Sequence, residues 1–338
     1  MDIKNTVTSL CKACGASGSE DAAAELALEM LREYCPDAHI ESGNVIGSYG
    51  THTGDKPLLV LDAHIDQVGF IVTSITDEGF IKFSSIGGID RRLLPAQPVV
   101  IHGSKDVRGV ICSVPPHLSK GDSKVLSFDD AAIDAGYPAD ELKKLVQPGD
   151  TITYDVQPRS LLGSRITAPS LDDRSGVAAI LRSLELLEGG ESAYNVTVIF
   201  STQEEVGERG AAIGAYTLDA DVALAVDVSF GWAESEDEKN CGYMGKGAMI
   251  GISPSLSRLV SRKLISTAES CGLPYQTEVM SGLTSTNADR YSVARSGAKT
   301  GTVSIPLRNM HTPVEVIDLE DVENTARLLA GFMKENLQ

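Results

Sequence analysis

The sequence is poor in basic residues and has no long apolar run. Its 29 lysines and arginines are set against 47 aspartates and glutamates, which gives a formal net charge of -18 at pH 7. A protein of this charge repels phosphate backbones and anionic lipids, so we expect neither nucleic-acid nor membrane partners. No apolar stretch reaches the roughly 18 residues of a membrane span, and residues 1–15 lack the apolar segment of a signal peptide. We therefore expect a cytoplasmic protein.

Cysteine and nucleophile motifs are also sparse. The six cysteines are scattered, and the CxxC pair of Cys11 and Cys14 has no second pair or nearby histidines to complete a zinc site. We expect reduced thiols that take part in packing. The sequence has no Walker loop, no strand-linked GxGxxG and no GxSxG elbow, which argues against nucleotide binding and a serine nucleophile.

Apolar strand-like runs alternate with amphipathic helix-like segments. The expected strands are residues 39–41, 45–49, 58–61, 196–200, 222–226 and 302–305, and the expected helices are 6–14, 18–34, 174–187, 256–270 and 319–336. Ser17 and Glu20 stand at the spacing of a capping box at the start of the second helix, and Asp318 can cap the last one. The alternation predicts an α/β fold with a mostly parallel central sheet flanked by helices on both faces.

Residues 69–166 interrupt this alternation. They contain short β-like pieces separated by glycine, proline and aspartate turns, which favour a small β-barrel or sandwich. We therefore expect an α/β domain built from residues 1–68 and 167–338, with residues 69–166 inserted into it as a β-rich domain.

Residue types that bind metals follow three of the apolar strands. The strands expected to end near residues 61, 200 and 226 lead, in turn, into His64 and Asp66, into Glu204 and Glu205, and into Asp227. Ligands of open α/β sheets bind outside the carboxyl ends of the strands, so these side chains are expected to converge. Imidazole and carboxylate groups that converge can bind a metal ion.

Two spacings sharpen this hypothesis. His64 and Asp66 are two residues apart, so in extended backbone the carboxylate can hold one ring nitrogen and leave the other for a metal. An isolated pair of this kind is more often an ordinary surface or turn pair. Glu204 and Glu205 alone would fit a solvated face, but in a buried site they need a cation. If one binds a metal and the other bonds a water, the site has a Lewis acid and a general base.

Asp172 and His311 are further candidates. Asp172 and Asp173 open a helix, where a plain helix cap is the simpler interpretation. His311 lies in a loop just before Pro313, and a lone loop histidine proves little. The remaining histidines lack a carboxylate-rich context and are not expected to be ligands: His39, His52, His102 and His117.

Several blocks occur in a specific order along the chain: residues 15–18, 63–69, 87–95, 115–118, 171–176, 203–210, 226–228 and 308–316. Through these blocks the chain resembles, nearly end to end, the glutamyl aminopeptidase and tetrahedral aminopeptidase family of co-catalytic metallopeptidases. The resemblance implies that Asp172 bridges two ions about 3.5–4 Å apart. It implies that His64 and Asp227 complete the protein ligands of one ion, and Glu205 and His311 those of the other.

The resemblance also implies Glu204 as the general base and Asp66 as the residue that orients His64. Two divalent ions per subunit are implied, zinc first, with cobalt or manganese as alternatives. The implied reaction removes N-terminal residues from short or unfolded peptides. A deacylase or carboxypeptidase on the same two-metal core, and a non-catalytic metal-binding assembly, are the alternatives.

The family further implies that the insert is a dimerisation domain, so a homo-oligomer is expected. Its dimers often assemble into a hollow particle of twelve subunits, a dodecamer. This chain departs from the family pattern at Gln67, at residues 284–289 and at Asn309, where relatives have other residues. The side-chain pocket is therefore expected to differ, and no preferred N-terminal residue is predicted.

Overall fold

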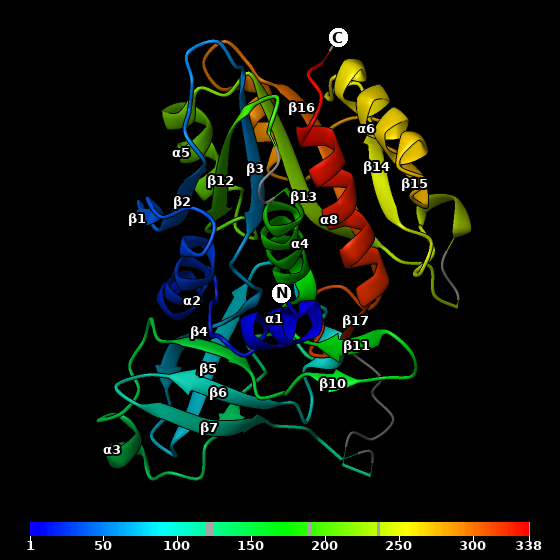
Figure 1. Ribbon diagram of the computed structural model, residues 1–338. Helices are drawn as coiled ribbons and strands as arrows, with labels where there is room; N and C mark the ends of the chain where they lie inside the picture. The colour runs from blue at the N-terminus through cyan, green and yellow to red at the C-terminus, as the bar shows by residue number, and fades with distance from the viewer. Residues whose placement is uncertain (116, 119–124, 188–190, 235–236, 338) are drawn as a thin grey trace.

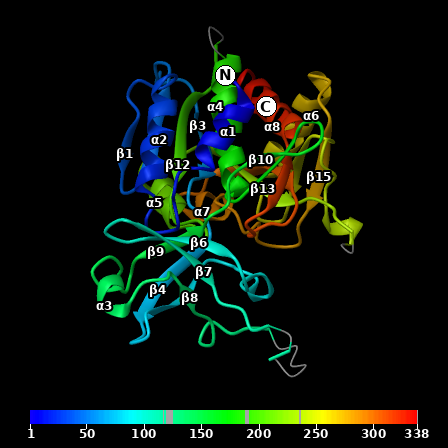
Figure 2. The same cartoon turned by 90° about the horizontal axis from the view of Figure 1, so that it is seen from below.

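The computed structural model describes residues 1–115, 117–118, 125–187, 191–234 and 237–337. Pro116, part of one block quoted above, lies outside the described residues. Within them, the chain forms an eight-stranded sheet covered by helices and a closed six-stranded barrel beside one end of it (Figures 1 and 2). The predicted fold class, an α/β sheet with an inserted β-barrel, is confirmed.

The central sheet is parallel in its middle. The strands, in spatial order, are β1 (His39–Glu41), β2 (Asn44–Tyr49), β12 (Asn195–Ser201), β3 (Leu58–His64), β13 (Val222–Phe230), β16 (Lys299–Leu307), β14 (Ala248–Ile252) and β15 (Tyr275–Val279). Strands β12, β3, β13 and β16 run parallel to one another. On either side of this group, β2 pairs antiparallel with β12, and β14 pairs antiparallel with β16. The carboxyl ends of four neighbouring strands therefore lie at one edge of the sheet.

Helices cover both faces of this sheet (Figure 1). They are α1 (Ile3–Leu10), α2 (Asp21–Arg32), α4 (Leu171–Leu187), α5 (Arg209–Leu218), α6 (Arg258–Ser270), α7 (Ala288–Val293) and α8 (Leu319–Met333). Successive strand residues point to opposite faces, so Leu59 and Leu61 of β3 join the large core formed with α1, α2, α4 and α8. Val60 joins a separate cluster with Ala211 of α5 and Tyr291 of α7.

The barrel has a core of its own. Its strands are β4 (Gly69–Ile75), β5 (Phe80–Ile86), β6 (Pro98–His102), β7 (Asp106–Ile111), β8 (Ile133–Asp134) and β9 (Thr151–Tyr154). Phe70 is fully buried at its centre and meets Phe83 and Tyr154 edge-on, with ring centroids 5.1 Å and 5.4 Å away. The domain limits at residues 69 and 166, and the dimerisation role, stay predictions.

A small three-stranded sheet joins the end of the insert to the C-terminal part of the chain. It consists of β10 (Arg159–Ser160), β11 (Arg165–Ala168) and β17 (Glu315–Asp318). Its register pairs Ala168 with Glu315, so the residues just before α4 lie beside those just after His311. The remaining short elements are η1 (Arg91–Leu93), α3 (Ala139–Leu142) and η2 (Glu238–Asn240).

Two expectations for the N-terminal region are wrong. The first helix spans Ile3–Leu10 and not residues 6–14, and the Asp2 side chain caps its start by accepting the backbone N–H of Asn5. The expected capping box does not form, since Ser17 Oγ donates instead to Asp66 Oδ2 at 2.6 Å. Glu20 is the N-cap residue of α2 but makes no side-chain capping bond. A long-range bond to a buried carboxylate has replaced a local one.

Other expectations are met or extended. Asp318 caps α8 by accepting the N–H of Glu320 at 3.1 Å, as predicted. Strands β14 and β15 and helices α5 and α7 are additional to the elements expected from the sequence. Within the described residues, no disulfide joins any of the six cysteines. Within the described ranges, no helix has both the length and the apolar character that crossing a membrane requires.

Candidate metal centre

The residues selected from the strand ends converge at the carboxyl edge of the sheet. His64 is the last residue of β3, and Glu204 and Glu205 lie in the turn after β12. The expected strand end at residue 226 is wrong, because pairing with β16 extends β13 to Phe230. Asp227 therefore belongs to the strand itself and reaches the site from within it.

Asp172 lies between the two histidines. Its Oδ1 is 3.0 Å from Nε2 of His64, and its Oδ2 is 3.3 Å from Nε2 of His311. The backbone of Asp172 and Asp173 is not helical, and the peptide bond between them is cis. Asp173 Oδ1 accepts the N–H of Gly176 at 2.9 Å, as a helix cap does. The capping interpretation thus applies to Asp173, and Asp172 is left to face both imidazoles.

His311 makes contacts through both ring nitrogens and through its backbone N–H. Its Nε2 is 3.2 Å from Oε2 of Glu205, and its Nδ1 is 2.8 Å from the carbonyl oxygen of Gly88, which follows β5 of the barrel. A carbonyl can only accept, so Nδ1 carries the proton and Nε2 faces the carboxylates. The buried Glu315 accepts the backbone N–H groups of His311 at 2.8 Å and Asp172 at 3.2 Å.

Asp66 connects the end of β3 to the turn after β12. It is fully buried and accepts hydrogen bonds from Ser17 Oγ at 2.6 Å and from the N–H groups of Glu204 at 2.9 Å and Glu205 at 3.2 Å. Nδ1 of His64 lies 3.4 Å from its Oδ1. Burial raises the pKa of Asp66, but bonding to His64 and Ser17 outweighs this and leaves the pKa below its ordinary value.

Two more carboxylates approach His64. Oε2 of Glu204 and Oδ1 of Asp227 are 4.0 Å and 3.9 Å from its Nε2. Burial, and after it the charges of neighbouring carboxylates, raises the pKa of Glu204 to about 9 and that of Asp227 to about 8, against the opposing effect of His64. The pKa of Glu205 is also raised, first by burial. These carboxyl groups are difficult to keep ionised without added positive charge.

The pKa values of the two histidines are raised as well. Burial lowers the pKa of His311, but hydrogen bonds to Asp172 and Glu205 raise it to about 11. The same competition, with Asp172 and Asp66 as partners, brings the pKa of His64 well above its ordinary value. The surrounding carboxylates therefore favour the charged form of both imidazoles. The same carboxylates would stabilise a bound cation.

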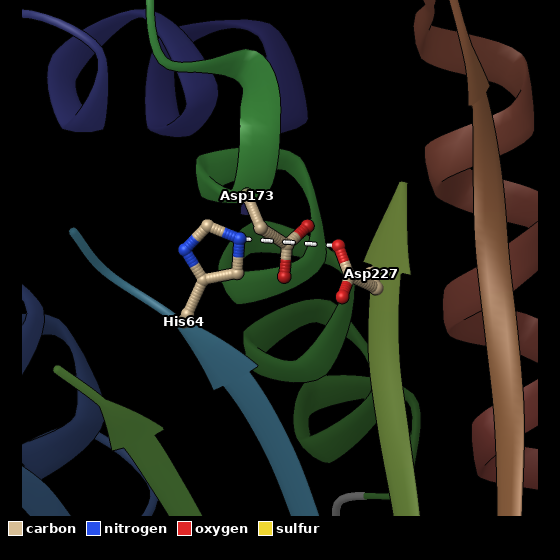
Figure 3. A group of neighbouring side chains, drawn as sticks. All are labelled: His64, Asp173 and Asp227. Carbon is tan, nitrogen blue, oxygen red and sulfur yellow. Dashed lines mark ion pairs between the residues drawn. The ribbon is translucent and has the colours of Figure 1, made fainter. Parts of the chain in front are cut away.

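The donor atoms are close enough to share cations. Three groups have one ligand atom per residue within 4.8 Å of one another: His64 with Asp173 and Asp227, His64 with Glu204 and Glu205, and Asp172 with Glu205 and His311. Figure 3 shows the first group, with the ring of His64 on β3 directed toward carboxylates from α4 and β13. Imidazole nitrogens and carboxylate oxygens suit zinc, cobalt or manganese, so these residues fit divalent cations.

Sequence reasoning missed two acidic residues here. Asp173 was treated only as the neighbour of Asp172, although its position beside a candidate ligand was visible. The sequence gives no indication of the role of Glu315 except its position four residues after His311. Its two backbone partners, Asp172 and His311, are 143 and 4 residues away along the chain. Its role in fixing both backbones depends on the pairing of β11 with β17.

The site opens into a cavity of about 600 Å³. Acidic and histidine side chains dominate its charged lining, among them His64, Asp172, Glu204, Asp227, Glu278 and His311. None of the described residues that line it is a lysine or an arginine. The cavity therefore favours positively charged groups.

Comparison with known proteins places this geometry in context. Residues 43–328 match the model of the M42 glutamyl aminopeptidase family. A lysyl aminopeptidase of Pyrococcus furiosus is 29% identical, and the match covers 92% of this chain and 90% of that protein. The solved structure of an aminopeptidase from the archaeon Desulfurococcus kamchatkensis has a TM-score of 0.93 and 32% identity, covering 99% of this chain and 95% of its own. The TET1 peptidase of Pyrococcus horikoshii has a TM-score of 0.88 and 29% identity, covering 99% and 100%.

Divalent cations are expected to stabilise the fold through this site. Protein treated with a chelator and then given Zn²⁺ should unfold at a higher temperature, because a ligand that binds only the folded state adds about 2.7 kcal/mol at 100 times its Kd. Scanning calorimetry measures the shift. Asp172→Asn should reduce it, whereas Asp77→Asn, at an exposed aspartate of the insert, should not. A melting temperature that responds to none of Zn²⁺, Co²⁺ and Mn²⁺ would contradict a cation site.

Proposed function

Because the chain belongs to the M42 glutamyl aminopeptidase family, we propose that the centre around Asp172 uses two divalent cations to cleave N-terminal residues from peptides. The chain is an aminopeptidase, a hydrolase of peptide bonds, and metal dependence is general in its family. One observation carries the proposal for this centre. The two oxygens of Asp172 each face the Nε2 atom of a different histidine, His64 and His311.

Five residues would hold the cations. Asp172 would be shared, with His64 and Asp227 on one side and Glu205 and His311 on the other. The proposal is supported by the separations of 3.9 Å between His64 and Asp227 and 3.2 Å between His311 and Glu205. Zinc is the first expectation, with cobalt or manganese as alternatives. When bound, such ions polarise a peptide carbonyl and make water more acidic.

Glu204 would act as the general base. Its carboxylate lies 4.0 Å from Nε2 of His64, and its backbone is held by Asp66. Burial raises its pKa to about 9 in the metal-free site, and bound cations would lower this pKa and keep the carboxylate ionised, as a general base requires. In the proposed reaction Glu204 removes a proton from water and passes it to the leaving amine. Asp66 would position His64 from the other side of the ring.

The substrate would be a short or unfolded peptide with a free N-terminus. The negative lining of the cavity suits an α-ammonium group, and about 600 Å³ is the volume of a site for a side chain or small ligand. Relatives are named for different N-terminal residues, lysyl in one case and glutamyl in another. Family membership therefore leaves the preferred residue open.

Aminoacyl p-nitroanilides with a free amine should be hydrolysed, and their N-acetylated forms should not. Treatment with a chelator should abolish hydrolysis, and restoring a divalent cation should return it. Absorbance of the released nitroaniline measures both. Faster hydrolysis of the acetylated forms would instead support a deacylase or carboxypeptidase. Metal content without any hydrolysis would support a non-catalytic metal-binding assembly.

Replacing each of the two neighbouring glutamates in turn should separate catalysis from metal binding. Glu204→Gln should reduce kcat roughly 10²- to 10⁴-fold, the usual contribution of a general base, and keep the metal content nearly unchanged. Glu205→Gln should lose bound metal, measured by elemental analysis after dialysis. Circular dichroism serves as the folding control for both variants. Unchanged turnover in Glu204→Gln would remove this residue from the mechanism.

We also propose that the chain forms a homo-oligomer through its insert. The Pyrococcus horikoshii TET1 peptidase can assemble into a tetrahedron or a large octahedral shell, and one of its structures is a dodecamer. Exposed apolar side chains occur in the insert of this chain, including Val114, Leu118 and Leu162, which are 66%, 64% and 95% exposed. We propose that a second chain covers these side chains, since exposed apolar surface, where it is contiguous, marks protein–protein contacts.

Light scattering should give a mass several times that of the 35.8 kDa chain. Leu162→Glu should shift the population toward smaller species, because a charge at a covered apolar position opposes association. Leu283→Glu, at a position 76% exposed outside the insert, is the matched control. A monomeric unaltered chain would rule out the proposed assembly.

A further inference from the structure

A carboxylate that pairs with no lysine or arginine of the described residues lies in the wall of the cavity. Glu278 belongs to β15 at the edge of the sheet and lines the same space as His64 and Asp227. Its Oε1 accepts a hydrogen bond from Ser229 Oγ, and its Oε2 accepts one from Ser304 Oγ at 3.4 Å. These hydroxyl groups orient the carboxylate, but they do not cancel its charge.

The surroundings leave this charge uncompensated. Glu208, another acidic residue of the lining, forms an ion pair with Arg290 at 3.0 Å. Glu278 has no such pair, because none of the described residues that line the cavity is a lysine or an arginine. Burial raises the pKa of Glu278, which reflects the cost of a partly desolvated anion without a counter-ion. A cation that enters the cavity would lower this cost.

The distance of Glu278 from the metal centre follows from β13. Ser229 is two residues after Asp227, so the two side chains project from the same face and their Cα atoms are roughly 7 Å apart. Glu278 contacts Ser229, so its carboxylate lies on the same face of β13 as Asp227 and further along the strand. Met280 and Met310 also line the cavity and offer apolar contact for an aliphatic stem.

We propose that Glu278 selects peptides whose N-terminal residue is lysine or arginine, by pairing with the cation of that side chain. This inference rests on the proposed function, because it assumes that the peptide's α-amine and carbonyl lie at the metal centre. A lysine or arginine stem would extend along β13 and bring its charge to the two oxygens of Glu278. An N-terminal aspartate or glutamate would meet a like charge there, and a neutral residue would leave Glu278 unpaired.

The test compares lysyl, arginyl, norleucyl and glutamyl p-nitroanilides on the full chain loaded with metal. Norleucine has a linear aliphatic side chain like that of lysine but no ammonium group. We expect kcat/KM for the lysyl substrate to exceed that for the norleucyl substrate roughly 10-fold or more, as a hydrogen bond to a charged group allows. The glutamyl substrate should be the poorest of the four.

Two variants connect this preference to Glu278. Glu278→Gln keeps the shape and the hydroxyl contacts, so kcat/KM for lysyl and arginyl substrates should fall roughly 10- to 100-fold while norleucyl hydrolysis stays near the unaltered level. Glu269→Gln is the control. It removes the same charge from an exposed glutamate that bonds Tyr275 at the start of β15, and it should keep the lysyl preference.

The outcomes separate this inference from the proposed function. Loss of activity in Glu278→Gln that is equal for all four substrates would assign this residue a structural role and overturn the selectivity. Norleucyl hydrolysis that matches or exceeds lysyl hydrolysis in the unaltered chain would overturn it too, while leaving the aminopeptidase intact. If none of the four substrates is hydrolysed, both ideas fail.

Discussion

The site depends on one constraint. Negative charge is buried at one edge of the sheet, and positive charge is needed there to offset it. Glu204, Glu205 and Asp227 all have raised pKa values, first because of burial. Carboxylates at this density remain ionised only with cations among them. The Nε2 atoms of His64 and His311 meet part of this requirement, and the proposed divalent ions would meet the rest. The same negative lining suits a substrate that arrives with an ammonium group.

The fold holds these groups against their mutual repulsion by attaching each of them to a rigid element. Parallel pairing of β12, β3 and β13 fixes the strand ends, and Asp66 bonds the turn after β12 to His64. Glu315 plays the same part between Asp172 and His311. The barrel also contributes to the site, because the Gly88 carbonyl oxygen accepts from Nδ1 of His311.

In the proposed mechanism, different parts of the sheet serve catalysis and selectivity. The residues proposed to bind cations come from its parallel centre and from α4, where strand ends converge by topology. Glu278 comes from the edge strand β15, outside the sequence blocks that carry the family resemblance. An edge strand can change its side chains without disturbing the centre.

The sequence by itself determined the α/β alternation, the β-rich insert and the strand ends that carry His64, Glu204 and Glu205, because apolar periodicity and turn composition are local properties. Only the tertiary structure decided that Ser17 bonds Asp66 instead of capping a helix, and that Asp173 takes the cap while Asp172 faces the histidines. It alone showed the contact of Glu278 with Ser229, which are 49 residues apart. Such bonds depend on which distant segments the fold brings together, and no local pattern records that.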